Sequence, residues 1–176
     1  MARKPDDILD ELLVLSAQSG DQKAMTSLVK RYHSMLISYA YRTTQNGEAA
    51  QDSVQEAWKV VLGKLQALHD PAHFKTWIYR IVHNKAVDWV RKQTKERVQN
   101  EVFQSAEAEE SESDDKIEKM ADALRRLDPV KRQLIEMYYR DNLSVHDISI
   151  ILKIPEGTVK SRLYSARSTL KDMMAN

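Results

Sequence analysis

The sequence predicts an all-α protein made of two small helical domains joined by a flexible acidic linker. Only four glycines and four prolines interrupt the 176 residues. Apolar residues recur at helical spacing, and no convincing run alternates apolar and polar residues as a half-buried strand would. The apolar pattern fails in one stretch, which is rich in Glu, Ser and Ala. We therefore expect domains at residues 1–95 and 117–176, with the linker at residues 96–116.

The formal net charge of +1 hides an uneven distribution. Of the chain's 27 basic and 26 acidic residues, two and nine respectively lie within residues 100–122. The rest of the chain therefore carries an excess of eight positive charges. Two basic domains on either side of an acidic joint suit a polyanionic partner.

Several functional classes are disfavoured by what the sequence lacks. There is no cysteine, which excludes disulfides and thiolate zinc sites. No apolar run approaches the roughly 20 residues that span a bilayer, and the N-terminus turns acidic where a signal peptide is apolar. The five histidines show no metal-binding spacing, and Pro71 argues against a helical His69–His73 pair. Without a phosphate loop or nucleophile motif, we expect a cytoplasmic non-enzyme with no cofactor, metal, small-molecule substrate or membrane insertion.

Four helices are expected in the N-terminal domain. Asp6 or Asp7 caps the first, and Asn46-Gly47 ends the second. The third and fourth are predicted at about residues 49–68 and 75–92. The third helix buries an apolar stripe from Val54 to Leu65, and its outward face carries Asp52, Gln55, Glu56 and Lys59.

The outward face of the third helix has two interpretations. An acid, an amide and an acid at this spacing can engage arginines on a partner helix. Most charged helix faces, however, merely meet water.

A second polar stripe is predicted on the fourth helix. Trp77, Arg80, Asn84, Asp88 and Arg91 fall on one side at 100° per residue. An aromatic ring beside cations and an amide is suited to unstacked bases of a single strand. Asp88 is expected to pair with a neighbouring cation, and Trp77 is equally compatible with a core position.

The C-terminal domain has the pattern of a helix-turn-helix. Ser144 is a natural N-cap for a short helix, residues 153–157 form a tight turn, and a second helix begins near Glu156 or Gly157. The second helix presents an apolar stripe of Val159, Leu163, Ala166 and Leu170, and an opposite face of Lys160, Ser161, Tyr164, Arg167, Ser168 and Lys171. Hydroxyls, cations and one aromatic suit phosphates and base edges in a major groove. The alternative is a solvated basic helix that closes a bundle.

The C-terminal pattern resembles the promoter-anchoring domain of extracytoplasmic-function (ECF) sigma factors. The similarity is carried by Leu127-Asp128-Pro129, Leu143-Ser144, Asp147-Ile148, residues 157–163 and Ala166-Arg167. It implies contacts with the −35 element: base contacts from Lys160, Ser161, Tyr164 and Ser165, and phosphate contacts from Arg162 and Arg167. The sequence departs from the family at Ser165, where a larger cation is usual, and at His146, Asp147 and Ser149.

The N-terminal domain resembles the same family at two places. The run Asp52 to Trp58 is similar to the polymerase-docking segment, which implies that Asp52, Gln55 and Glu56 bind the clamp helices of the polymerase largest subunit. Ala49 and Gln51 stand where the family often has acids. The run Phe74 to Asp88 is similar to the helix that melts and reads the −10 element. This implies −10 contacts from Trp77, Arg80, Asn84 and Arg91, and from His69 and Asp70 in the preceding loop.

The resemblance implies a sigma factor that binds core RNA polymerase, directs it to promoter DNA and initiates transcription. Such proteins are often held inactive by an anti-sigma factor. Two other classes remain open from the residues alone: a helix-turn-helix regulator that does not dock on polymerase, and a helical protein-binding adaptor. Only a sigma factor is expected to co-purify with core polymerase and to bind DNA weakly alone.

The linker gives a first prediction. Because residues 99–115 lack an apolar face, we expect early proteolytic cleavage and random-coil amide resonances there in the free protein. Limited proteolysis with mass mapping and an NMR spectrum of the full chain provide the measurement. Full protection of these amides would contradict the prediction.

Overall fold

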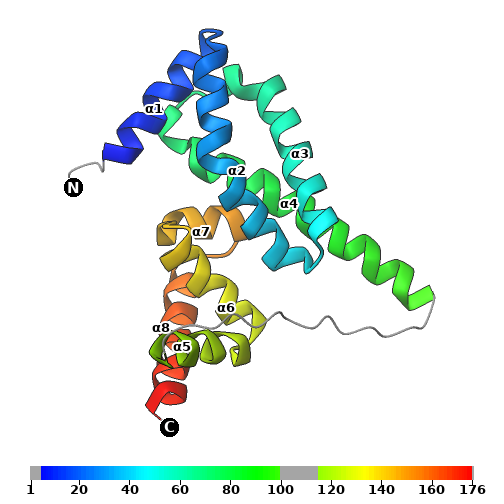
Figure 1. Ribbon diagram of the computed structural model, residues 1–176, viewed down its shortest axis with the longest axis vertical. Helices are drawn as coiled ribbons and strands as arrows, with labels where there is room; N and C mark the ends of the chain where they lie inside the picture. The colour runs from blue at the N-terminus through cyan, green and yellow to red at the C-terminus, as the bar shows by residue number, and fades with distance from the viewer. Residues whose placement is uncertain (1–4, 100–114, 176) are drawn as a thin grey trace. The chain divides into compact units, whose positions relative to one another are not determined.

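The computed structural model describes residues 5–99 and 115–175, and every regular element in these ranges is helical, as predicted. The chain divides into two compact units, residues 1–103 and 104–176. Each unit has its own buried core, and Figure 1 shows the helices that make up each one.

The first unit contains four α-helices and two short 3-10 turns. The elements are α1 (Pro5–Gln18), α2 (Gln22–Thr44), α3 (Gly47–Lys64), η1 (Leu65–Ala67), η2 (Pro71–His73) and α4 (Phe74–Gln99). This confirms the expected order of helices. The last turn predicted for the third helix is tightened into η1, and α4 continues past Lys92.

Side chains at the helix ends explain these boundaries. The Asp21 carboxylate accepts hydrogen bonds from the backbone N–H groups of Lys23, at 2.8 Å, and Ala24, at 3.3 Å. Asn46 caps α3 in the same way, through a 2.9 Å bond from the Ala49 N–H. Both bonds satisfy donors that have no partner inside the helix.

Aromatic rings from α2 and α4 form the centre of the first unit. The rings of Tyr32 and Phe74 pack edge to face with their centres 5.5 Å apart, and those of Tyr39 and Tyr79 do so at 5.2 Å. The Tyr39 hydroxyl also lies 2.9 Å from Nδ1 of His83. All four aromatic residues are buried. The α3 stripe from Val54 to Leu65 packs into the same core, and it is buried as predicted.

A polar contact fastens α1 to α2. The buried Tyr32 hydroxyl donates to Asp10, and Nε of Arg31 donates to the other Asp10 oxygen at 2.7 Å. Burial and this hydrogen bond raise the pKa of Tyr32. Burial lowers the pKa of Arg31, but the hydrogen bond and charge of Asp10, with Asp6 nearby, raise it overall.

At the other end of α1, Nε2 of Gln18 donates to two backbone carbonyls, those of Leu65 and Leu68, at 2.8 Å each.

The second unit is a smaller helical bundle. Its elements are α5 (Asp115–Arg126), α6 (Pro129–Ile135), a π-helical turn η3 (Glu136–Arg140), α7 (Val145–Leu152) and α8 (Glu156–Ala175). Asp128 caps α6, and Pro129 occupies its first turn, as expected. The core is made of Leu127, Leu134, Met137, Leu143, Ile148, Ile151, Val159, Leu163 and Ala166.

The structure corrects both ends of the predicted linker. Helix α4 continues to Gln99 and α5 begins at Asp115, so the ends of the range 96–116 are helical. Residues 93–99 contain no Gly or Pro, and the apolar pattern on which the boundary was predicted ends before the helix does. Residues 100–114, the body of the predicted linker, lie outside the described residues.

Within residues 5–99 and 115–175, no helix has both the length and the apolar character that a bilayer span requires.

The Asp10 contact gives a prediction for stability. Asp10→Ala leaves the buried Tyr32 hydroxyl and the Arg31 guanidinium without their acceptor, so we expect the first unit to lose about 1–3 kcal/mol of unfolding free energy. Urea unfolding followed by tryptophan fluorescence measures this unit alone, because Trp58, Trp77 and Trp89 all belong to it.

Two variants control this experiment. Asp10→Asn keeps an acceptor oxygen and should lose less stability than Asp10→Ala. Asp7→Ala removes an exposed acid from the same helix and should change stability by no more than about 0.5 kcal/mol. Equal unfolding curves for Asp10→Ala and Asp7→Ala would contradict the assigned role of Asp10.

Candidate protein-docking and nucleic-acid surfaces

The outward face of α3 is polar and accessible. Asp52 and Gln55 are exposed and Glu56 is half-buried, while the opposite stripe is buried. Among the described residues, no hydrogen bond or ion pair involves the side chain of Asp52 or of Gln55. Oε1 of Glu56 accepts a hydrogen bond from Lys59 at 2.6 Å, and this bond lowers the pKa of Glu56. The face therefore offers one unpaired carboxylate and one that already holds a lysine.

This geometry is suited to a cationic protein partner. Carboxylates on a rigid helix can accept charge-assisted hydrogen bonds from arginine or lysine. A partner that approaches Glu56 has to displace or share the Lys59 ammonium group. The buried indole N–H of Trp58 has no hydrogen-bond partner in the described parts of the chain, and it lies on the core side of the same helix.

The predicted polar stripe of α4 lies at the surface. Arg80 and Arg91 are exposed, and Trp77 and Asn84 are half-buried. Trp77 fits both the core and the base-stacking interpretation in part. Its ring centre lies 6.2 Å from that of the buried Phe74, in an edge-to-face arrangement, and part of the Trp77 side chain remains accessible. Asp88 pairs with Arg91 at 4.0 Å, as expected for an acid on a cationic stripe.

The loop before α4 is organised by Asp70. Its carboxylate accepts from the Ala72 N–H at 3.0 Å and pairs with Nδ1 of His73 at 3.0 Å. Asp70 is thus the N-cap of η2, a structural role that the sequence analysis did not assign. His69 is exposed immediately before it.

The helix-turn-helix is confirmed in detail. Ser144 and Asp147 form a reciprocal capping box at the start of α7. The Asp147 N–H donates to the Ser144 hydroxyl at 3.1 Å, and the Ser144 N–H donates to the Asp147 carboxylate at 2.9 Å. Lys153 adopts a left-handed conformation, φ 56°, and ends α7. The turn then leads directly into α8 at Glu156. The α8 stripe predicted to face inward is buried.

The outward face of α8 carries the residues predicted to meet DNA. Tyr164 is 76% exposed, Ser161 is exposed and Ser165 is half-buried. At 100° per residue, Lys160 lies along one edge of this face and Arg162 along the other, and both are exposed. A polar stripe with a cation along each edge is suited to the base edges and phosphates of a major groove.

Arg167 has structural partners that the sequence analysis missed. Its guanidinium lies 5.5 Å from the ring centres of both Tyr138 and Tyr139. These rings meet edge to face at 5.0 Å within the π-helical turn. The consecutive tyrosines were the available signal, and the π-helical turn that holds both of them beside Arg167 was not predicted.

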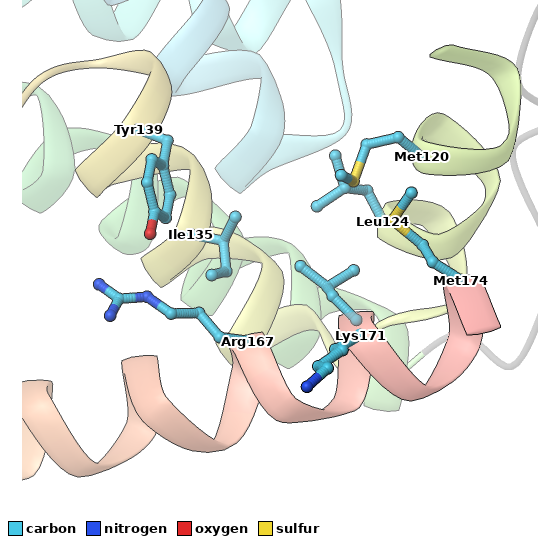
Figure 2. A pocket seen from close by; sticks show the side chains of 8 residues that line it. Met120, Leu124, Ile135, Tyr139, Arg167, Lys171 and Met174 are labelled. Atoms are coloured by element: carbon cyan, nitrogen blue, oxygen red, sulfur yellow. The ribbon is translucent and has the colours of Figure 1, made fainter. Parts of the chain in front are cut away.

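An apolar groove lies beside Arg167 in the second unit. It has a volume of about 670 Å³, and Figure 2 shows side chains from α5, α6, η3 and α8 around it. Arg167 and Lys171 contribute cations, and the other lining residues are Met120, Leu124, Ile135, Tyr139, Leu170 and Met174. The helical spacing of Met120 and Leu124 indicates a core, and the structure gives these residues a partly open surface instead.

Family models match both units. Residues 28–96 match the model described as sigma-70 region 2, and residues 117–170 match the model described as sigma-70 region 4. The first range contains α3 and most of α4, and the second contains the helix-turn-helix. The two matched regions therefore coincide with the surfaces described above.

Relatives match almost the full length of the chain. The ECF RNA polymerase sigma-E factor of Escherichia coli K12 is 30% identical over 180 residues, covering 94% of each chain. The sigma-E factor of Haemophilus influenzae is 27% identical and covers 95% of this chain and 96% of its own.

Two solved structures share the fold. CnrH in complex with the cytosolic domain of CnrY has a TM-score of 0.66 at 24% identity, covering 95% of this chain and 97% of its own. The sigma factor RpoE of Bartonella quintana, solved with the anti-sigma factor NepR, has a TM-score of 0.69 at 22% identity. It covers 87% of this chain and 98% of its own.

The stacking of Arg167 gives a prediction for the second unit. Arg167→Ala removes two cation–ring contacts, each worth about 0.5–1 kcal/mol at an exposed site, so α8 should open more readily. Hydrogen exchange of the α8 amides in the full chain measures this opening.

Tyr164→Ala is the matched control, because the Tyr164 ring is largely exposed and its loss should leave exchange unchanged. Arg167→Lys keeps the charge without the planar group, so its α8 amides should exchange at a rate between those of Arg167→Ala and Tyr164→Ala. Unchanged protection in Arg167→Ala would show that the tyrosine contacts contribute nothing to stability.

Proposed function

This chain belongs to the ECF family of RNA polymerase sigma factors, which direct core polymerase to promoters, and we propose how its surfaces divide that work. The α3 face of Asp52, Gln55 and Glu56 docks on core RNA polymerase. The α4 stripe and the loop before it contact the −10 element. The outward face of α8 contacts the −35 element.

The docking face is supported by its accessibility and its charge. Asp52 and Gln55 project from a helix whose other side is fixed in the core, so a partner meets a rigid surface. Exposed carboxylates favour a cationic partner surface, and the family resemblance implies that this partner is the clamp helices of the polymerase largest subunit. This exposed acid–amide–acid face, within the sigma-70 region 2 match, is the observation that carries the proposal.

The −10 surface is proposed on similar grounds. A partly accessible ring stacks on an unpaired base, and nearby cations hold the strand's phosphates. The residues assigned to it are Trp77, Arg80, Asn84 and Arg91 on α4, with His69 and Asp70 in the loop. Asp70 acts by holding the loop in shape, since its carboxylate is committed to Ala72 and His73.

The −35 surface divides into two kinds of contact. Lys160, Ser161, Tyr164 and Ser165 face base edges, and Arg162 and Arg167 meet phosphates on the borders of the groove. Tyr138 and Tyr139 orient Arg167 for its contact. The half-buried Ser165 replaces a larger cation of the family pattern, and we expect it to contribute less to affinity.

The proposal describes a non-enzymatic initiation factor that acts in the cytoplasm, where polymerase and DNA are found. It needs no cofactor or small-molecule substrate. An anti-sigma factor is a further proposed partner, because NepR is such a protein and is bound to an RpoE of the same fold.

Charge reversal on α3 tests the proposed function. Asp52→Lys with Glu56→Lys should weaken binding to core polymerase at least tenfold, because an attractive charge pair becomes repulsive. Promoter-directed transcription should fall with it. The urea midpoint of the first unit should stay unchanged, since the substituted side chains do not enter the core. Fluorescence titration of labelled protein with core enzyme gives the affinity.

The control changes the same amount of charge elsewhere in the first unit. Asp7→Lys with Glu96→Lys alters two exposed acids away from the docking face and should bind core polymerase normally. A folded α3 variant with normal affinity for polymerase would overturn the docking proposal. Tight, specific duplex binding by the free wild-type chain, without polymerase binding, would favour a helix-turn-helix regulator.

A further inference from the structure

A polar cluster at the start of α8 is left unexplained by the surfaces above. Oε1 of Glu156 lies 2.9 Å from Nδ1 of His146 on α7. Its other oxygen, Oε2, lies 3.9 Å from Nζ of Lys160, one turn further along α8. Each oxygen of one carboxylate is therefore held by a different helix of the helix-turn-helix.

This cluster orients the carboxylate without burying it. The exposed fractions of the side chains are 46% for Glu156, 63% for His146 and 67% for Lys160. An ionised carboxylate has about four acceptor positions and donates nothing, so the proton of the short contact belongs to Nδ1. The His146 contact occupies one acceptor position, and Lys160 at 3.9 Å is an ion pair beyond hydrogen-bond distance, so other acceptor positions can take a donor that arrives from solvent.

The position of Glu156 in the fold suggests what that donor is. Glu156 is the first residue of α8, the second helix of the helix-turn-helix. In this motif, the N-terminal residues of the second helix meet base edges in the major groove. Glu156 therefore has the location of a base-reading residue and an orientation fixed in advance.

Gly157 supports close approach at the same point. A Cβ built there meets no heavy atom within 4 Å, so packing inside the described unit does not require a glycine. Glycine nevertheless weakens a helix relative to alanine. A bare backbone beside Glu156 lets another molecule come near the helix start, which is one established use of glycine.

We propose that Glu156 reads a cytosine of the −35 element by accepting a hydrogen bond from its N4 amino group, with His146 as the positioning residue. This inference rests on the proposed function. In the major groove, guanine presents two acceptors, which repel a carboxylate, and thymine presents an acceptor and a methyl group. Adenine presents an amino donor beside the N7 acceptor, whereas cytosine presents its amino donor alone. A carboxylate therefore selects cytosine.

The neighbouring groups make this reading compatible with DNA. A carboxylate near a phosphate backbone is repelled, and Lys160 offsets that repulsion locally. Glu156 in turn limits where Lys160 can reach, since the two charges lie 3.9 Å apart. Base preference at the start of α8 thus depends on both residues, whereas Lys160 was the only one of them assigned from the sequence.

The test uses holoenzyme made from core polymerase and the full chain. The wild-type holoenzyme first selects promoters from a library randomised across the −35 element. Competition binding of every single-base variant of the selected promoter then gives a preference at each position. Glu156→Ala should lose the preference for cytosine at one position, by roughly 5- to 150-fold as is usual for one mismatched base pair in a site, and leave the other positions unchanged. Glu156→Gln should shift that position toward adenine, which an amide reads through N6 and N7.

Variants of His146 test the positioning role. His146→Ala should reduce discrimination at the same position only, and His146→Asn, which retains a donor, should restore part of it. Asp122→Asn, which alters an acid on α5, should change no position. Hydrogen exchange of the α8 amides verifies folding. Because Glu156→Gln preserves the shape of the side chain, this variant keeps the test valid if Glu156→Ala unfolds.

Two results would overturn the inference. One is an unchanged preference profile in both Glu156 variants. The other is a uniform gain in affinity for all sequences with a steeper salt dependence, because Glu156 would then only reduce the positive charge of the helix. A wild-type holoenzyme that selects no promoter would instead refute the proposed function, so the two failures are distinguishable.

Discussion

The contact between α2 and α4 through buried aromatic rings is the constraint on which the first unit depends. Two edge-to-face pairs and the Tyr39–His83 hydrogen bond determine how α4 is rotated about its axis. A helix has one rotation at which the rings interlock, and that rotation turns the Trp77 stripe outward. Helix α3 packs on both helices, so the same core also fixes the direction of the Asp52 face. The two surfaces proposed for polymerase docking and for single-stranded DNA are therefore oriented by a single set of core contacts.

The helices and their buried stripes were predictable from sequence because a period of 3.6 residues encodes them directly. The α3 and α8 stripes, the Ser144 cap and the turn before Glu156 were all predicted and are confirmed. Periodicity says less about helix ends and about side chains that meet across helices. The continuation of α4 to Gln99, the π-helical turn and the stacking of Arg167 depend on such features. Met35 shows the same limit, since its position in α2 follows the helical spacing of the buried Leu28, Tyr32 and Tyr39 and yet its side chain is exposed. The contacts proposed with polymerase and DNA stay predictions.

The two units use different means to present their polar residues. In the first unit, the polar faces lie on long helices whose opposite sides are packed against an aromatic core, so few local contacts are needed to orient them. In the second unit, surface side chains are held by one another: Ser144 by Asp147, Glu156 by His146, and Arg167 by two tyrosines. Recognition in the second unit is consequently more sensitive to single exposed substitutions than burial alone would suggest.

The place of Arg167 couples two regions of the second unit. The side chain lines the apolar groove that also includes Met120 and Leu124, and it is one of the cations proposed for DNA (Figure 2). A ligand that fills the groove and holds the guanidinium withdraws it from the phosphate. Thermodynamic linkage then requires that bound DNA lower the affinity for the ligand by the same factor by which the bound ligand lowers the affinity for DNA. Occupancy of the groove and the proposed phosphate contact are thus linked through the Arg167 side chain.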